Sequence, residues 1–233
     1  MIVNGVDLHE KYKKNVTWLS QTIQPRNVIT YTDWLDTGID PVKIKPNRYT
    51  DFEIYIDMLI KGNSKEECEQ LMSSMLSEFD SGIVKLDDME FQYTFDFKSE
   101  NRELVKRWLY HYELTLTGYN KLGTRQSLDF AGTEQTFTVP GTDKTPLVLT
   151  VSSNIALNSL TIEGLTEQAF TISEVQKDSK IVIDGENCTI TENGENILGK
   201  TDLWEFPQAE PGSWTLKLSS VCTANLSYYP RYR

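Results

Sequence analysis

The chain has 233 residues, 39% of them hydrophobic and 24% charged, which is the composition of a globular protein and not of a disordered or fibrous one. Its net charge of −11 argues against nucleic acid or an anionic membrane as a partner, because both are bound through clustered Lys and Arg. No stretch approaches 18 apolar residues, and the first residues lack the pattern of a signal peptide. Three cysteines without CxxC spacing indicate neither a zinc site nor a disulfide framework, and they predict synthesis in a reducing cytoplasm.

Residues 51–60 form the first clear element, because apolar and mostly polar side chains alternate along them with the period of a half-buried strand. A helix is predicted next. Ser64 with Glu67 three residues later is a capping box, and Ser81-Gly82 is expected to end the helix. One apolar stripe follows its length, made of Cys68, Leu71, Met72, Met75, Leu76 and Phe79.

Residues 89–98 alternate again and predict a second strand, followed by a turn at Ser99-Glu100-Asn101 and a third strand over 105–117. This half of the chain therefore reads as an antiparallel sheet packed on one helix. Residues 11–48 contain Trp18, Trp34 and a Pro- and Lys-containing stretch, and they are interpreted as an extended arm or an excursion from the sheet.

The pattern breaks between Gly118 and Gly132, where the domain boundary is placed, giving domains of residues 1–125 and 126–233. Beyond it the chain contains only short alternating segments with closely spaced turns, which favours an all-β sandwich. Asp184-Gly185 and Asn193-Gly194 are dipeptides typical of type I′ hairpin turns. The alternating segments are centred on 147–151, 160–162, 170–172, 181–183 and 214–218.

One motif pair suggests catalysis. Asp36-Thr37-Gly38 and Asp80-Ser81-Gly82 both fit the Asp-Thr/Ser-Gly signature in which two carboxylates share a proton. The spacing is too short for two protease lobes, and the second motif lies at the predicted end of the helix. A structural role is therefore favoured, and no catalytic residue is predicted.

The remaining candidates also favour structural roles. His9 and His111 are isolated, the cysteines lie in apolar phase, and Asp33, Asp36 and Asp40 lack the spacing of an EF-hand loop. Trp204 and Trp214 suit either a sugar-stacking platform or the core of a sandwich, and the core is favoured. No enzyme, cofactor or metal site is predicted, and no binding residue is assigned.

Three stretches carry short motifs. Residues 1–8 have the pattern of an opening β-hairpin, and residues 180–195 contain the elements IDGE and ENGE of a strand–turn–strand. The third stretch is the last part of the sequence, with Phe206-Pro207, then Pro211-Gly212, then Tyr229-Pro230-Arg231. In their order and spacing these stretches resemble the distal tail protein (Dit) family of long-tailed phages. The resemblance is strongest over the last hundred residues and covers the first part mainly in the order of its elements.

The resemblance implies a mainly β fold, with an N-terminal antiparallel β-sandwich and one packed helix, tail-tube-like, and a C-terminal galectin-like β-sandwich. It implies a structural protein of the virion tail tip, assembled in the bacterial host cytoplasm. Such a protein forms a homohexameric ring that joins the tail-tube protein to the baseplate or tail-associated fibre protein. A negatively charged bore would suit DNA passage, and Glu53, Asp57, Asp87-Asp88, Glu90, Asp96 and Glu100 are candidates to line it.

The alternative function is a carbohydrate- or receptor-binding module of a phage adhesion device. Galectins bind sugar with a His- and Arg-rich strand pair and a stacking Trp. Residues 131–233 contain no His, and their arginines are Arg231 and Arg233 at the very end. The resemblance to galectins is therefore interpreted as one of fold and not of sugar binding.

Overall fold

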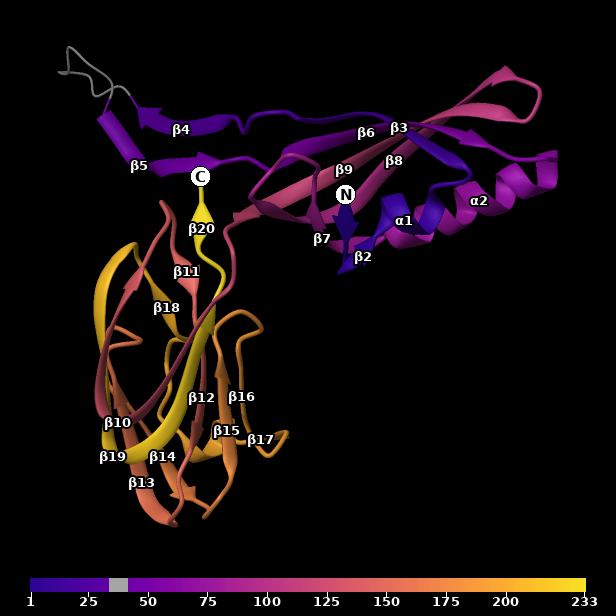
Figure 1. Ribbon diagram of the computed structural model, residues 1–233. Helices are drawn as coiled ribbons and strands as arrows, with labels where there is room; N and C mark the ends of the chain where they lie inside the picture. The colour runs from indigo at the N-terminus through magenta and orange to yellow at the C-terminus, as the bar shows by residue number, and fades with distance from the viewer. Residues whose placement is uncertain (34–41) are drawn as a thin grey trace. The chain divides into compact units, whose positions relative to one another are not determined.

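The computed structural model describes the backbone of residues 1–33 and 42–233, and the side chains of 1–29 and 50–233 (Figure 1). The described chain divides into two compact units, residues 1–121 (unit 1) and residues 122–233 (unit 2). Both are built mainly of antiparallel strands, which confirms the predicted fold class. No helix among the described residues has the length and apolarity needed to cross a membrane.

Unit 1 is one sheet with a helix against one of its faces. The strand order is β2-β1-β7-β8-β9-β6-β3, with the short helix α1 beside the N-terminal hairpin. A separate hairpin pairs β4 with β5. The elements are β1 (Ile2–Val3), β2 (Val6–Asp7), α1 (Leu8–Tyr12), β3 (Val16–Ile23), β4 (Val28–Asp33), β5 (Val42–Tyr49), β6 (Phe52–Lys61), α2 (Lys65–Glu78), β7 (Ser81–Lys85), β8 (Gln92–Lys106) and β9 (Leu109–Leu122).

The predicted strand and helix at the centre of unit 1 are confirmed. The apolar set of β6 is buried, and it shares a core with Cys68, Met72 and Met75 of α2. Ser64 caps the helix by accepting the Glu67 N–H at 3.1 Å. The Glu67 carboxylate in turn accepts the N–H of Asn63, so the reciprocal bond forms one residue earlier than a standard capping box.

The expected end of the helix is wrong. α2 ends at Glu78, where the Phe79 N–H returns to the Leu76 carbonyl at 3.0 Å, and Ser81-Gly82 already belongs to β7. Gly82 is there for another reason. Its φ is +135°, and a Cβ would stand 1.9 Å from the side-chain oxygen of Asn4.

The turn predicted at Ser99-Glu100-Asn101 is also wrong. β8 continues to Lys106, and the chain reverses at Arg107-Trp108, where Trp108 has a φ of +59°. From residue 101 to 107 every residue is exposed, so no apolar alternation marks the extension as a strand. The β8–β9 hairpin tip carries Leu104 and Val105, which are 60% and 54% exposed.

Residues 16–33 and 42–49, the greater part of the described residues between 11 and 48, are mainly extended, as predicted, but β3 belongs to the sheet. β3 pairs with β6 in a register that joins Val16 to Ile60, and a bulge interrupts the pairing between Trp18 and Ser20. The N-terminal hairpin implied by the resemblance forms as β1–β2. The helix α1 was not predicted; Asp7 caps it by accepting the N–H groups of His9 and Glu10.

Unit 2 is a β-sandwich organised around β19, which pairs with β10, β12 and β13. The path through its main sheet is β14-β13-β19-β12-β15-β16-β17, and β11 pairs with β18. The elements are β10 (Gln126–Val139), β11 (Thr145–Pro146), β12 (Val148–Ser152), β13 (Leu157–Glu163), β14 (Phe170–Val175), β15 (Lys180–Asp184), β16 (Thr189–Glu192), β17 (Glu195–Asn196), the 3-10 turn η1 (Leu198–Lys200), β18 (Gln208–Ala209), β19 (Gly212–Tyr228) and β20 (Arg231–Tyr232).

One of the two predicted type I′ turns is confirmed. Asn193 and Gly194 have φ values of +52° and +89°, as that turn requires. The other connection is longer, because the Asp184 carboxylate accepts the N–H groups of Glu186 and Asn187 and the left-handed residue is Cys188. Gly185 is packed too tightly for a side chain, since a Cβ would stand 2.0 Å from the Pro207 carbonyl oxygen.

Candidate functional site

The two Asp-Thr/Ser-Gly motifs do not form a described carboxylate pair. Asp80 is exposed just after α2, and Asp36-Thr37-Gly38 lies outside the described residues, as do Asp40 and the side chains of Asp33 and Trp34. The structural role favoured for the second motif has a physical basis, because Gly82 admits the Asn4 side chain that accepts the Ile83 N–H at 2.9 Å.

His9 is held in a surface network on α1. Its Nε2 lies 2.6 Å from Asp87 Oδ2, and its ring centroid is 5.4 Å from that of Trp18. Partial burial would raise the pKa of Asp87, but hydrogen bonds from the Met1 amine, His9 and Gln21 outweigh it and hold the pKa below its usual value. Asp87 is therefore a structural acceptor that fixes the N-terminal segment to the strand edge.

His111 belongs to a small cluster on the polar face of the unit 1 sheet. One ligand atom each from Asp57, His111 and Glu113 lies within 4.8 Å of the others, and Asp57 and Glu113 are direct cross-strand neighbours on β6 and β9. Among the described residues, this is the group of His, Cys, Asp and Glu side chains whose ligand atoms lie close enough together to hold a metal ion. Both carboxylates already accept hydrogen bonds, from Ser20 and Asn101 respectively.

The cysteines divide by burial. Cys68 is packed under α2 and Cys222 in the core of unit 2, and burial raises the pKa of both thiols, which makes them poor nucleophiles. Cys188 is exposed in the β15–β16 loop, and no basic side chain hydrogen-bonds to it among the described contacts.

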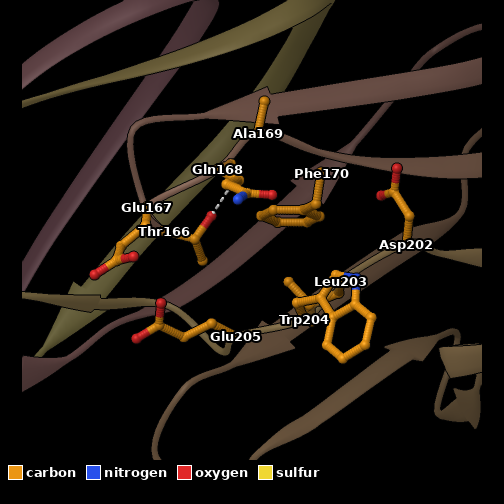
Figure 2. A pocket seen from close by; sticks show the side chains of 9 residues that line it. All are labelled: Thr166, Glu167, Gln168, Ala169, Phe170, Asp202, Leu203, Trp204 and Glu205. Carbon is orange, nitrogen blue, oxygen red and sulfur yellow. Dashed lines mark hydrogen bonds between the residues drawn. The ribbon is translucent and has the colours of Figure 1, made fainter.

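An open pocket lies on unit 2 between two short segments. One wall is residues 166–170, which lead into β14, and the other is residues 202–205, which precede β18 (Figure 2). The cavity has a volume of about 260 Å³. Hydrogen bonds at the ends of these two segments hold them together, because the Asp202 carboxylate accepts the N–H of the neighbouring Thr171 at 2.5 Å and the Gln208 N–H donates to the Leu165 carbonyl at 3.2 Å.

Trp204 at this pocket is not part of the core, so the interpretation favoured from the sequence is wrong for it. Its side chain is 96% exposed, whereas Trp214 packs against the core and donates Nε1–H to the Glu210 carbonyl at 2.8 Å. The segment is extended, and Leu203 is the residue that turns inward. The stretch Asp202-Leu203-Trp204-Glu205 is too short to show an alternation that would have placed Trp204 outside the core.

The pocket is acidic. Its lining contains the carboxylates of Glu167, Asp202 and Glu205 around the ring of Phe170, and no Lys, Arg or His. In Figure 2, Glu167 and Glu205 lie on one side of that ring and Asp202 on the other. None of the three acids appears among the ion pairs of the described chain, whereas the buried Glu192 nearby in sequence is paired with Lys200.

Unit 1 carries a different kind of surface. Its outermost strand, β3, pairs only with β6 within the described part of the chain, and Leu19 at its bulge is 52% exposed. Leu104 and Val105 are exposed on the β8–β9 hairpin. Of the thirteen large hydrophobic side chains found exposed among the described residues, nine belong to unit 1, so the apolar surface available for association lies mainly there.

Comparison with solved structures gives the same architecture over the whole chain. The crystal structure of SPP1 Dit (gp 19.1), described as a paradigm of the hub adsorption apparatus in phages infecting Gram-positive bacteria, matches with a TM-score of 0.77 and 8% identity, covering 100% of this chain and 98% of that one. A chain of the phage p2 baseplate in its activated conformation, solved with Ca and with Sr, matches with a TM-score of 0.60 and 12% identity, covering 92% of this chain and 90% of that one. No curated protein sequence matches significantly.

The sequence itself matches a family model over residues 140–232, that of the siphovirus-type tail component, C-terminal domain. The matched segment lies within unit 2, whereas the fold match extends over both units. Residues 140–232 are therefore similar to the siphovirus-type tail component family, and over its whole length the chain has the fold of a Dit protein.

Proposed function

We propose that the protein forms a hexameric ring at the virion tail tip through unit 1, and that the ring joins the tail-tube protein to the baseplate or tail-associated fibre protein. The observation that carries this proposal is the family match over residues 140–232 together with the Dit fold of the whole chain. The role is structural and needs no cofactor, in keeping with a family of structural tail proteins.

The distribution of exposed apolar side chains supports unit 1 as the ring-forming unit. Within the described ranges β3 is paired along one side only, where Leu19 is exposed, and the β8–β9 hairpin projects Leu104 and Val105. Exposed strand edges and exposed apolar side chains on a hairpin are both features that neighbouring subunits cover in assemblies.

The polar face of the unit 1 sheet supports a ring wall that repels DNA. Glu53, Asp57, Asp96 and Glu113 lie on strands β6, β8 and β9, and Glu53 is paired with Lys98. Two of the acids named from the sequence are engaged elsewhere. Asp87 binds His9, and Glu100 accepts from Tyr112 and Arg102 on the side of the sheet that α2 covers. Asp88 and Glu90 lie in the connection between β7 and β8 and not on a strand. The acidic wall is accordingly proposed for the four acids of the polar face.

The ring is tested by the mass in solution and by the symmetry of assembled tails. We expect light scattering of the full chain at rising concentration to approach six times 26.8 kDa, and images of the tail tip to show six-fold symmetry. The double variant Leu104→Ser/Val105→Ser removes apolar surface from the hairpin, and it should lower the assembled fraction without changing the melting temperature. The matched control is Val221→Ser, at a 68% exposed position of unit 2. A tail tip of another symmetry would contradict the proposal.

A further inference from the structure

The pocket beside Trp204 has the features of a docking site for a positively charged side chain. A solvent-exposed indole is unfavourable in water unless another molecule covers it, and Trp is enriched at the centres of protein interfaces. Of the four tryptophans whose side chains the structure describes, Trp18, Trp108 and Trp214 are partly buried, and Trp204 is 96% exposed.

The negative charge of the pocket favours a positively charged ligand. Three carboxylates line it without a cation, and unit 2 has few basic residues with which to supply one. Lys200, the nearest basic residue in sequence, lies 3.5 Å from Glu192. Glu205 accepts a hydrogen bond from the side-chain amide of Gln208, but none of the three carboxylates is paired with a cation among the described residues. A cation entering the pocket would therefore meet carboxylates without a charged partner and the face of an indole, which are the two partners that a guanidinium prefers.

The pocket is also shaped for a side chain and not for a longer segment. Its volume of about 260 Å³ admits one extended arginine, and the ring of Phe170 closes its floor. The walls are fixed by the Asp202–Thr171 and Gln208–Leu165 hydrogen bonds and by a backbone bridge between Ile172 and Thr201. Binding then requires little reordering of the protein.

We propose that unit 2 docks a protein partner through an arginine side chain of that partner, whose guanidinium stacks on Trp204 and pairs with Glu167 and Glu205. Asp202 has a positioning role, because one of its oxygens is already bonded to the Thr171 N–H. The proposal depends on unit 2 alone. It stands or falls separately from the ring, since none of its residues belongs to unit 1.

The test uses the full chain labelled with ¹⁵N and follows the indole N–H signals. Trp204→Phe assigns the Trp204 signal, and at a 96% exposed position it should leave the melting temperature unchanged. The probe is Nα-acetyl-arginine amide, and the matched probe is Nα-acetyl-citrulline amide, which has nearly the same shape without the charge. We expect a saturable shift of the Trp204 signal with the arginine probe and at least a fivefold weaker response with the citrulline probe.

Two further comparisons decide whether the carboxylates are responsible. Glu167→Gln/Glu205→Gln should weaken binding at least fivefold, and raising NaCl from 50 to 500 mM should weaken it as screening increases. The control Asp178→Asn/Glu195→Gln makes the same change in net charge at exposed positions outside the pocket and should bind as the wild type does. Absence of a shift, an equal response to citrulline, or an unchanged affinity in Glu167→Gln/Glu205→Gln would each overturn the proposal. A saturable shift with N-acetylglucosamine or glucose instead of arginine would also overturn it, and would identify a glycan site.

Discussion

Each unit contains a β-sheet with an apolar face, and the two units bury that face in different ways. Unit 2 covers its core within one sandwich, and β19 is bonded on both sides by other strands of the unit. Unit 1 covers one sheet face with α2, but it leaves β3 as an open edge and extends the β8–β9 hairpin beyond the core, with every residue from 101 to 107 exposed. The difference indicates that the core of unit 2 is covered by its own strands, whereas the fold of unit 1 leaves surfaces that other chains could cover.

The largest expected effect tests whether unit 2 folds without unit 1. We expect a fragment of residues 122–233 to unfold in one cooperative transition, because its core is formed by its own strands. The measurement is thermal and urea unfolding followed by circular dichroism. A fragment that aggregates, or that unfolds without a cooperative transition, would contradict both this boundary and the one predicted at 125/126.

A cavity in either core should destabilise that unit alone. Met72→Ala in unit 1 and Leu149→Ala in unit 2 each remove a fully buried side chain, and each should cost about 2–5 kcal/mol of unfolding free energy. Thiol labelling across a urea series separates the units, because Cys68 reports on one and Cys222 on the other. Equal loss of protection at both cysteines in either variant would show that the units unfold as one.

The cap of α2 gives a smaller effect within unit 1. Ser64→Ala removes the acceptor of the Glu67 N–H and should lower stability by about 1 kcal/mol. Ser73→Ala, at an exposed position inside the same helix, is the control, and it should be neutral or stabilising by a few tenths of a kcal/mol, about the difference in helix propensity. The readout is the urea midpoint of Cys68 protection. A loss as large in Ser73→Ala would show that the serine change itself, and not the cap, is responsible.

The smallest expected effect is a pH dependence in unit 2. Burial would raise the pKa of Glu192, but the Gln176 N–H at 3.0 Å, Ser179 and Lys200 hold it below its usual value. A lowered folded-state pKa stabilises the fold above about pH 4.3, the ordinary value, and this contribution is lost as the pH falls through the folded-state pKa. Melting of Glu192→Gln should therefore lie below that of the wild type at pH 7, and the difference should shrink toward pH 3. The exposed Glu195→Gln should show no such trend.

The sequence predicted those elements whose side chains alternate between core and solvent. β6 and the stripe of α2 were recognisable because every second, or every third and fourth, residue is buried. The predicted strand ended too early, near residue 99, because almost all residues beyond that point are exposed on both faces of the β8–β9 hairpin. Without a buried face, the sequence has no alternation of apolar and polar residues that would indicate a strand. Asp184-Gly185 misled for another reason, since the tight approach of the Pro207 carbonyl, and not a two-residue turn, requires that glycine.

The candidate site was harder to predict than the fold. Trp204 was assigned to the core because most tryptophans in a sandwich are core residues, and a pattern of one residue in and one out is not visible in the short stretch before Phe206-Pro207. The pocket lies between residues 166–170 and residues 202–205, which are far apart in the sequence. Hydrogen bonding between Asp202 and Thr171 holds these segments together, and no local sequence motif predicts that contact.

The length of β19 sets the order in which unit 2 can be completed. β19 pairs Tyr228 with Gln126 and Gly212 with Val139, so β10, the first strand of the unit, cannot complete its pairing until β19 has been made. Closing so long a loop has an entropic cost that precedes the reward of pairing, and topologies dominated by such distant contacts fold slowly. During synthesis, β10, β12 and β13 are made before the strand that pairs with all three. The sandwich therefore cannot close until residues 212–228 have been made, and until then β10, β12 and β13 lack the strand with which all three pair.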